Sequence, residues 1–465
     1  MTTLHDRSAV ELLALYARRV ASPVEVLSDL LAHLERCEPK IAALWAQDAD
    51  AALAAARESE ARWVRGQARA LDGMPVTIKE NIATRGVPVP LGCAATPLVP
   101  ALSDAPPSAR LREAGAVIVA KTTMPDLGML SSGLSSFHKL TRNPWDLSKN
   151  PGGSSAGAAA ACAAGYGPLH IGTDIGGSIR LPASWCSIVG VKPSLGRIPI
   201  DPPYAGRVAG PMTRTVQDAA LAMSVLAQPD ARDTMSLPHQ DIAWRELDMD
   251  LRGLKIGLWL DAGWGMAVEA EVLDTVNAAA RAFEQAGVIV EPLPPFTTRA
   301  MIDGLDAFWR MRAWQGIGAW PQAQRDKVLP YIHQWAAGGA ALTGEQVFSG
   351  HGQMAAIRDA CVAATQRFDF VLSAVSPVVS FPAEFASPLN DPARPFEHIA
   401  FTLPFNMSEQ PAVALNGGCG AGGFPIGVQL AGRRHDDLGV LRIARAFEQL
   451  RGAQRTWPVV GSRSG

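Results

Sequence analysis

The chain has 465 residues, 48% of them apolar, and its 42 basic and 44 acidic side chains leave a net charge of −2 at pH 7. This balance, with no basic block and no acidic tail, excludes a nucleic-acid-binding arm and a disordered acidic segment. The 43 glycines and 35 prolines exceed average usage, so we expect a loop-rich enzyme.

The N-terminal segment carries charged side chains at Asp6, Arg7, Glu11, Arg18 and Arg19 and has no apolar core of the kind found in a secretory signal. No uncharged apolar run reaches the about 18 residues of a transmembrane helix. The six cysteines lie far apart without a C-x-x-C pair, and no H-E-x-x-H pattern occurs. We therefore expect a cytoplasmic monomer or homodimer with reduced thiols, no metal or cofactor, and no membrane or nucleic-acid partner.

Helices are expected first along the chain. Ser22-Pro23-Val24-Glu25 forms a capping box with proline at the first helical position, and an amphipathic helix continues over Val26–Leu34. The alanine-rich stretch Ala49–Val64, with interleaved charges, predicts a second surface helix.

Short apolar strands then alternate with helices. The expected strands are Met74–Ile78, Ala116–Ala120, Leu169–Gly172, Lys255–Leu260, Val288–Glu291, Phe370–Ala374 and Ala412–Leu415. The expected helices are Val216–Ala227, Val268–Ala286 and Asp437–Leu450, and Asn416–Gly423 is expected to turn between two strands of a hairpin. This alternation predicts an α/β fold with a central mixed, mostly parallel sheet covered by helices on both faces.

Two glycine pairs each present a serine, at Gly152-Gly153-Ser154-Ser155 and Gly176-Gly177-Ser178. Glycine lets the backbone approach a ligand closely, and successive N–H groups in such a turn form an anion-binding nest. The apolar strand Leu169–Gly172 leads into the second turn, so Ser178 lies at a strand end, where it is placed for nucleophilic attack. The amides of Ile175, Gly176 and Gly177 precede it and are the candidate oxyanion hole.

Other interpretations of these turns are weaker. Gly153–Gly157 matches G-x-S-x-G, but that nucleophile elbow must follow a strand, and Asp146–Pro151 cannot form one. No lysine follows the glycines in the phosphate-binding pattern G-x-x-x-x-G-K-[ST]. His170 lies inside the strand that leads to Ser178 and cannot easily reach its tip, so we expect a structural role for it.

The two serine turns and the residues around them closely resemble the amidase signature family of Ser-Ser-Lys hydrolases. The match runs from Gly152 to Arg197, and it extends to Gly73–Ile82, Pro425–Leu430 and Ala444–Gln449. The resemblance implies one domain over 1–465. Its parts are N-terminal helices over about 1–68, the signature core over about 69–230, a variable substrate-pocket region over about 231–370 and the rest of the core over 371–465.

The resemblance also implies catalytic roles. Ser178 is the expected nucleophile, Lys79 the base, and Ser154, held in a cis peptide, the proton relay between them. A lysine acts as a base only when neutral, and Lys79 ends an apolar strand, which fits a buried amine with a lowered pKa. Ser155 is expected either to donate a hydrogen bond behind the site or to cap the following helix. Asp174 and Arg180 are expected to form an ion pair that fixes the turn.

The expected reaction is hydrolysis of an amide C–N bond through an acyl-enzyme on Ser178. The chain resembles the A-type subunit of glutamine amidotransferases, but the acid that precedes F-T-x-P in those proteins is absent, since His398–Ala400 precedes Phe401–Pro404. Ser131 is a candidate substrate contact. The middle region offers an aromatic cluster of Phe308, Trp309, Trp314, Trp320, Tyr331 and Trp335.

These features favour an uncharged, partly apolar or aromatic amide as the small-molecule substrate. Three alternatives remain open. The same site could hydrolyse a carbamate or an ester, because an oxyanion nest stabilises the same tetrahedral centre whatever the leaving group. The chain could instead be a glutamine amidotransferase A-type subunit, or a non-catalytic binding subunit.

Overall fold

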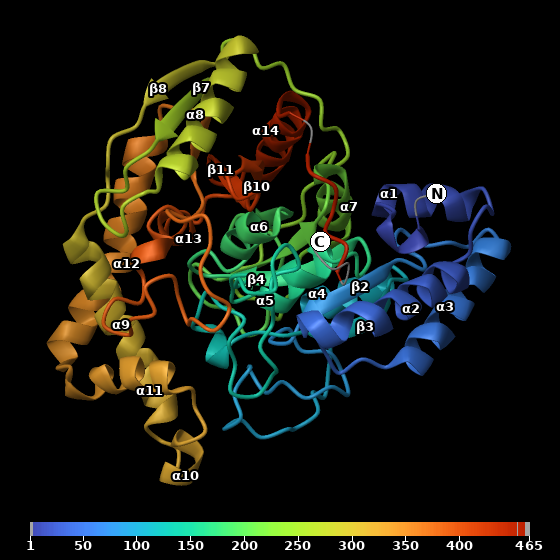
Figure 1. Ribbon diagram of the computed structural model, residues 1–465, viewed down its shortest axis with the longest axis horizontal. Helices are drawn as coiled ribbons and strands as arrows, with labels where there is room; N and C mark the ends of the chain where they lie inside the picture. The colour runs from blue at the N-terminus through green and yellow to red at the C-terminus, as the bar shows by residue number, and fades with distance from the viewer. Residues whose placement is uncertain (1–2, 453, 461–465) are drawn as a thin grey trace.

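An 11-stranded sheet forms the centre of the computed structural model, which describes residues 3–452 and 454–460 (Figure 1). The strand order across the sheet is β1-β3-β2-β4-β6-β5-β10-β11-β9-β7-β8. The strands are β1 (Leu44–Trp45), β2 (Pro75–Lys79), β3 (Val117–Thr122), β4 (Leu169–Asp174), β5 (Val189–Lys192), β6 (Val208–Thr213), β7 (Lys255–Trp259), β8 (Ile289–Pro292), β9 (Phe370–Ala374), β10 (Ala412–Cys419) and β11 (Pro425–Gly432).

The sheet is mixed, as expected, but the prediction that it is mostly parallel is wrong. Four of the strand pairs in the described residues are parallel, β2 with β3 and β4 and β7 with β8 and β9. Six are antiparallel and occupy the middle of the sheet and its β1 edge. The error arises at β5 and β6, which the sequence pattern does not predict. One has four residues and the other contains Gly210 and Pro211, which are depleted in strands.

The helices match the expected boundaries closely where the sequence has clear start signals. α3 (Ala49–Val64) and α14 (Asp437–Leu450) begin and end as predicted, and Ser22 caps α2 through the expected capping box. The remaining helices are α1 (Ala9–Ala17), α2 (Pro23–Ile41), α4 (Pro106–Glu113), α5 (Ala156–Ala163), α6 (Arg180–Cys186), α7 (Val216–Leu226), α8 (Ala270–Gln285), α9 (Arg299–Ile317), α10 (Gln322–Arg325), α11 (Pro330–Ala337), α12 (Gly344–Thr365) and α13 (Leu403–Met407). Short 3-10 turns lie at Leu4–Asp6, Asp126–Gly128, Gly338–Ala341 and Glu397–Ile399. None of the described helices is long and apolar enough to span a bilayer.

Helices cover both faces of the sheet. α6 and α14 pack against the same strands, β10 and β11, without packing on each other, so they lie on opposite faces. α5 lies beside α6 on one face, and α7 and α8 lie beside α14 on the other. The long helices α9 and α12, with α11, form a separate layer beyond the β9–β7–β8 half of the sheet (Figure 1). That layer comes from the part of the chain, about 231–370, that the sequence predicts to be a variable substrate-pocket region.

The alanine-rich helix α5 places the first serine turn against the sheet. All eight of its residues are buried, and it contacts β2, β3, β4 and β6. A Cβ on Gly157 would lie 2.3 Å from the Ala43 carbonyl oxygen and 2.4 Å from the Thr123 nitrogen, so the helix can come this close only with glycine there. The first turn of α5 therefore lies beside the ends of β2 and β4.

Candidate active site

The predicted lysine and both serine turns meet at one edge of the sheet. β2 and β4 are parallel neighbours, and they end at Lys79 and Asp174, so the residues that follow them emerge together. The Ser155 N–H donates to the Ser178 carbonyl at 3.1 Å, which joins the two serine turns directly. The Gly153–Ser154 peptide is cis, as the resemblance implies.

Lys79 is completely buried among hydroxyl groups. Its Nζ lies 2.8 Å from Ser154 Oγ, 2.9 Å from Thr173 Oγ1 and 3.2 Å from Ser155 Oγ. Burial lowers the pKa of Lys79 well below its usual value, and the positive charge of Arg207 lowers it further, against the opposing effect of the Asp174 and Glu80 carboxylates. The structure thus provides the desolvated lysine that the sequence predicts.

Ser155 serves as a hydrogen-bonding partner behind the site. Its hydroxyl donates to the Thr173 carbonyl at 3.1 Å and accepts from the Thr173 N–H at 3.2 Å. The Ser155 side chain makes no capping hydrogen bond to α5. Of the two roles expected for Ser155, the structure therefore shows hydrogen bonding behind the site and not helix capping. Thr173 Oγ1 also accepts from Asn81 Nδ2 at 3.1 Å. Asn81 lies two residues after Lys79, inside the segment that carries the family resemblance.

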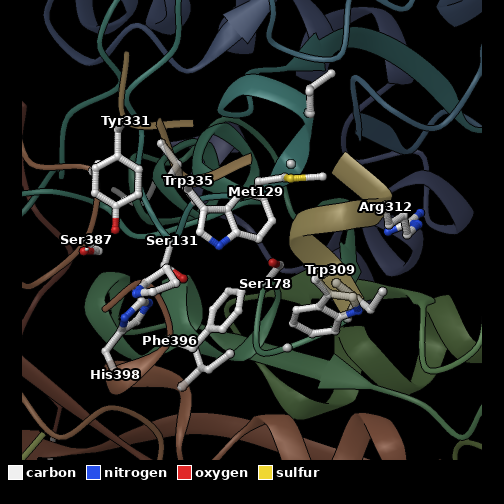
Figure 2. A pocket seen from close by; sticks show the side chains of 18 residues that line it. Met129, Ser131, Ser178, Trp309, Arg312, Tyr331, Trp335, Ser387, Phe396 and His398 are labelled. Atoms are coloured by element: carbon white, nitrogen blue, oxygen red, sulfur yellow. Dashed lines mark hydrogen bonds between the residues drawn. The ribbon is translucent and has the colours of Figure 1, made fainter. Parts of the chain in front are cut away.

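Ser178 is half-buried and lines a pocket (Figure 2). Within the described residues, no hydrogen bond joins the Ser154 and Ser178 hydroxyls, so that link of the relay stays a prediction. The Gly177 N–H donates to Asp174 Oδ1 at 2.8 Å and is therefore not free for an oxyanion, contrary to the expected three-amide hole. The amides of Ile175 and Gly176 have no protein acceptor in the described part of the chain.

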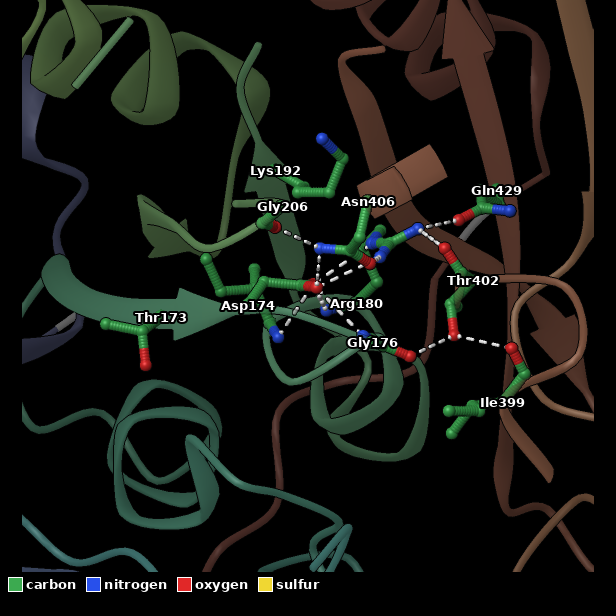
Figure 3. Close-up of polar contacts among 12 residues, drawn as sticks. Thr173, Asp174, Gly176, Arg180, Lys192, Gly206, Ile399, Thr402, Asn406 and Gln429 are labelled. Atoms are coloured by element: carbon green, nitrogen blue, oxygen red, sulfur yellow. Dashed lines mark hydrogen bonds and ion pairs between the residues drawn. The ribbon is translucent and has the colours of Figure 1, made fainter. Parts of the chain in front are cut away.

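The predicted ion pair between Asp174 and Arg180 is present and fully buried (Figure 3). The Asp174 carboxylate accepts from Arg180 Nε and Nη2, both at 3.0 Å, and from Asn406 Nδ2 at 2.9 Å. Burial alone would raise the pKa of Asp174, but Arg180 holds it far below its usual range. Asp174 is therefore an ionised brace for the Ser178 turn and not a proton carrier.

The C-terminal part of the core clamps the same turn from the other side. Arg180 Nη1 donates to the Thr402 carbonyl at 2.8 Å and to Gln429 Oε1 at 2.7 Å, and Thr402 Oγ1 donates to the Gly176 carbonyl at 2.6 Å. The sequence motifs assign no role to Thr402 or Gln429, although both lie in segments that stand out in the sequence. Their spacing along the chain does not reveal that they meet at Arg180.

His170 is structural, as expected. It is fully buried inside β4, where Nδ1 lies 2.8 Å from Thr77 Oγ1 and Nε2 lies 2.9 Å from the Gly167 carbonyl oxygen. Burial lowers the pKa of His170 to about 4, so the imidazole is neutral at physiological pH. Both ring nitrogens are engaged, and neither is available to Ser178.

The pocket in front of Ser178 encloses a cavity of about 110 Å³ and is mostly apolar. Three of the six aromatic residues of the middle-region cluster line it, namely Trp309, Tyr331 and Trp335. Phe308, Trp314 and Trp320 do not line it. The predicted Ser131 does, and further lining residues that the sequence does not assign to the site are Leu127, Met129, Arg312, Ser387, Phe396 and His398.

The polar groups of the pocket are unevenly distributed (Figure 2). Tyr331, Ser387, Ser131 and His398 lie on one side of Ser178, and Arg312 lies on the other. Burial lowers the pKa of His398 to about 3, so it is a neutral side chain. Among the described lining residues there is no Asp or Glu, and Arg312 alone carries a formal charge.

Comparison with known sequences connects this geometry to one family. A family model described as Amidase matches residues 25–441. The A-type subunit of glutamyl-tRNA(Gln) amidotransferase from Solidesulfovibrio magneticus is 35% identical over 468 residues, covering 93% of this chain and 94% of that protein. The protein of the same name from Nitratidesulfovibrio vulgaris is 33% identical over 501 residues and covers both chains completely.

Solved structures give a second comparison. A bacterial aryl acylamidase described as an amidase signature enzyme superposes with a TM-score of 0.87 at 29% identity, over 96% of each chain. The A-type subunit of glutamyl-tRNA(Gln) amidotransferase from Thermotoga maritima superposes with a TM-score of 0.78 at 25% identity, over 99% of each chain. The chain is thus similar both to an aryl acylamidase and to an amidotransferase component.

Proposed function

The chain belongs to the amidase signature family, and from this premise we propose that it is a serine amidase that hydrolyses an amide with an apolar or aromatic group beside the scissile bond. The observation that carries the proposal is the buried lysine. Its three nearest polar partners are hydroxyls rather than carboxylates, so nothing at Nζ compensates a positive charge. A neutral amine at this position can accept a proton.

The hydrogen bonds around Lys79 support one direction of proton flow. The Ser155 hydroxyl donates its proton to the Thr173 carbonyl, so towards Lys79 it can only accept, and it takes one proton of the neutral amine. Thr173 Oγ1 accepts the other amine proton. The lone pair of the neutral amine is then left for the Ser154 hydroxyl. Ser154 gives its proton to Lys79 and takes the Ser178 proton as Ser178 attacks.

The remaining steps follow from the same groups. Ser178 Oγ forms a bond to the carbonyl carbon, and the amides of Ile175 and Gly176 stabilise the resulting oxyanion. Ser154 then returns a proton to the nitrogen as the C–N bond breaks, which releases the amine and leaves an acyl-enzyme. Water, activated through the same relay, hydrolyses the ester and restores Ser178.

The pocket supports the proposed substrate class. Trp309, Trp335 and Phe396 give it an aromatic wall, and the likeness to a bacterial aryl acylamidase agrees with such a lining. Glutamine would bring an α-ammonium group into a pocket whose described lining residues include no carboxylate, and an unpaired buried charge is costly. Aryl carbamates and esters share the tetrahedral chemistry and fit the same proposal.

The glutaminase component of an amidotransferase is the second candidate function. The curated relatives favour it, since proteins at 33–35% identity carry that name over nearly the whole chain. In that case the chain would act with other subunits, and glutamine would be its amide substrate. The lining of the pocket is the observation that leads us to prefer the aryl amidase.

One panel of substrates separates the two candidates. The purified chain is assayed with 4-nitroacetanilide, a 4-nitrophenyl carbamate, 4-nitrophenyl acetate and glutamine, with Ser178→Ala as the blank. We expect kcat/KM for the anilide to exceed that for glutamine by at least about tenfold. A preference for glutamine, or transfer of ammonia to an acyl-tRNA when partner proteins are added, would overturn the proposal in favour of the second candidate.

A further inference from the structure

Among the described residues, two arginines without an ion-pair partner lie beside Tyr204, and one of them, Arg312, lines the catalytic pocket. Arg312, on α9, lines the pocket, and its guanidinium lies 3.9 Å from the centre of the Tyr204 ring. Arg207 lies three residues after Tyr204, and its side chain donates a hydrogen bond to the Pro202 carbonyl at 3.3 Å. Among the ion pairs of residues 3–452 and 454–460, none includes either arginine.

The charges beside Tyr204 are not balanced. Burial lowers the pKa of Arg207, the neighbouring Arg312 lowers it further, and Asp201 is the one carboxylate that acts in the other direction. Arg310, two residues before Arg312 on the same helix, is by contrast paired with Asp306 at 2.8 Å. Two neighbouring cations that form no ion pair within the described residues favour the arrival of an anion.

We propose that Arg312 and Arg207 form a subsite for a carboxylate on the leaving amine of the substrate. The guanidinium fork matches a carboxylate in plane and in spacing. The inference rests on the proposed amidase function and narrows its substrate class to amides of an apolar or aromatic amine that carries an acid.

The position of the two arginines assigns the acid to the amine half. Arg207 directly precedes Val208, which pairs with Asp174 at the end of β4, one residue after the Lys79 partner Thr173. In the proposed mechanism, Lys79 with Ser154 returns the proton to the leaving nitrogen. Arg312 lies across Ser178 from Ser131, His398 and Tyr331 (Figure 2). The neutral side of the pocket then takes the acyl group, so the uncharged group expected from the sequence fits there, and the charge lies beside Arg312.

Substrate pairs of equal shape test the subsite. Wild type is assayed with 4-acetamidobenzoate and its neutral isostere 4-acetamidobenzamide, and we expect the carboxylate to raise kcat/KM by about tenfold to a hundredfold, the range of charge-assisted hydrogen bonds. Arg312→Gln and Arg207→Gln should each reduce that ratio towards one. Arg252→Gln removes the same charge at an exposed site paired with Asp250 and should leave the ratio unchanged.

A binding measurement keeps this test independent of turnover. Calorimetric titration of Ser178→Ala with 4-aminobenzoate and 4-aminobenzamide should give at least about tenfold tighter binding of the acid, abolished by adding Arg312→Gln. Equal affinities, or a preference that survives both arginine substitutions, would refute the subsite. If no aryl amide is hydrolysed but the binding preference is present, the proposed function fails and the subsite stands. If both amides are hydrolysed with equal kcat/KM and the acid binds no more tightly, the subsite is refuted and the proposed function stands.

Discussion

The two sides of the catalytic pocket are built from different kinds of structure. On one side, Lys79, Ser154 and Ser178 lie on strand ends and on the turn before α5, and buried hydrogen bonds fix the backbone around them. On the other side, Trp309, Arg312 and Trp335 project from α9 and α11, outside the sheet. In the proposed function, the first side determines which reaction occurs, and the second determines which substrate is bound.

Loss of the nucleophile is the strongest test of the sheet side, meaning the side of the pocket that carries Lys79, Ser154 and Ser178. Ser178→Ala should lower kcat by at least about three orders of magnitude, because the activated hydroxyl that forms the acyl-enzyme is gone. Steady-state assays with an aryl amide measure the effect, and Ser148→Ala, in an exposed turn, is the control. An acyl adduct trapped on Ser154 or Ser155 and located by mass spectrometry would show that the nucleophile is misassigned.

Removal of the base should be nearly as damaging. Lys79→Ala is expected to approach the effect of Ser178→Ala, since groups that act as one relay do not contribute additively. In wild type, activity should rise with pH through the lowered pKa of Lys79, because the neutral amine is the base. The unfolded chain keeps that proton to higher pH, so Lys79 adds to folding stability as pH rises in the same window. An activity optimum near pH 5 would contradict a lysine base.

The contrast between the two sides also explains what the sequence can predict. Lys79, Ser154, Ser178 and the Asp174–Arg180 pair lie in short contiguous motifs, so their local sequence carries the information. Arg312 and Phe396 line one pocket but come from distant segments, and Arg207 comes from a third, so their arrangement depends on how α9 and the loops pack on the sheet. For the same reason only half of the aromatic cluster lines the pocket, since composition cannot tell which ring faces it. The sequence does not predict β6, because glycine and proline are depleted in strands, although the strand pairs with both β4 and β5.

The rigidity of the sheet side can be tested through stability. Asp174→Asn leaves Arg180 as a buried cation without its acid, a change that typically costs about 3–5 kcal/mol of unfolding free energy. Urea unfolding followed by circular dichroism measures the loss. Asp250→Asn is the matched control, because its partner Arg252 is exposed, and it should change stability little. Equal stabilities for the two variants would mean that the Ser178 turn is held by other contacts.

The apolar wall should affect affinity more than chemistry. Trp309→Ala removes a ring that lines the pocket and is expected to raise KM for an aryl amide by roughly tenfold with a smaller change in kcat. Trp314, on the same helix, packs near His333 outside the pocket, so Trp314→Ala should leave KM close to the wild-type value. If the two variants behave alike, the ring at Trp309 does not bind the substrate.

The smallest expected effect lies where the two sides meet, at Arg207. Its charge lowers the pKa of Lys79, although less than burial does, so Arg207→Gln should raise that pKa and move the alkaline rise of activity to higher pH. At neutral pH less of the lysine is then neutral, and kcat should fall modestly. The charge of Arg312 lowers the pKa of Arg207, but it is not among the charges that shift the pKa of Lys79. Arg312→Gln should therefore alter substrate preference without moving the pH profile. Profiles of kcat against pH for the two variants and a neutral anilide measure this difference. If both variants shift the profile equally, Arg207 and Arg312 both influence the pKa of Lys79. The charged residue on α9 would then affect the reaction as well as substrate binding, and the two sides of the pocket would not be separate in function.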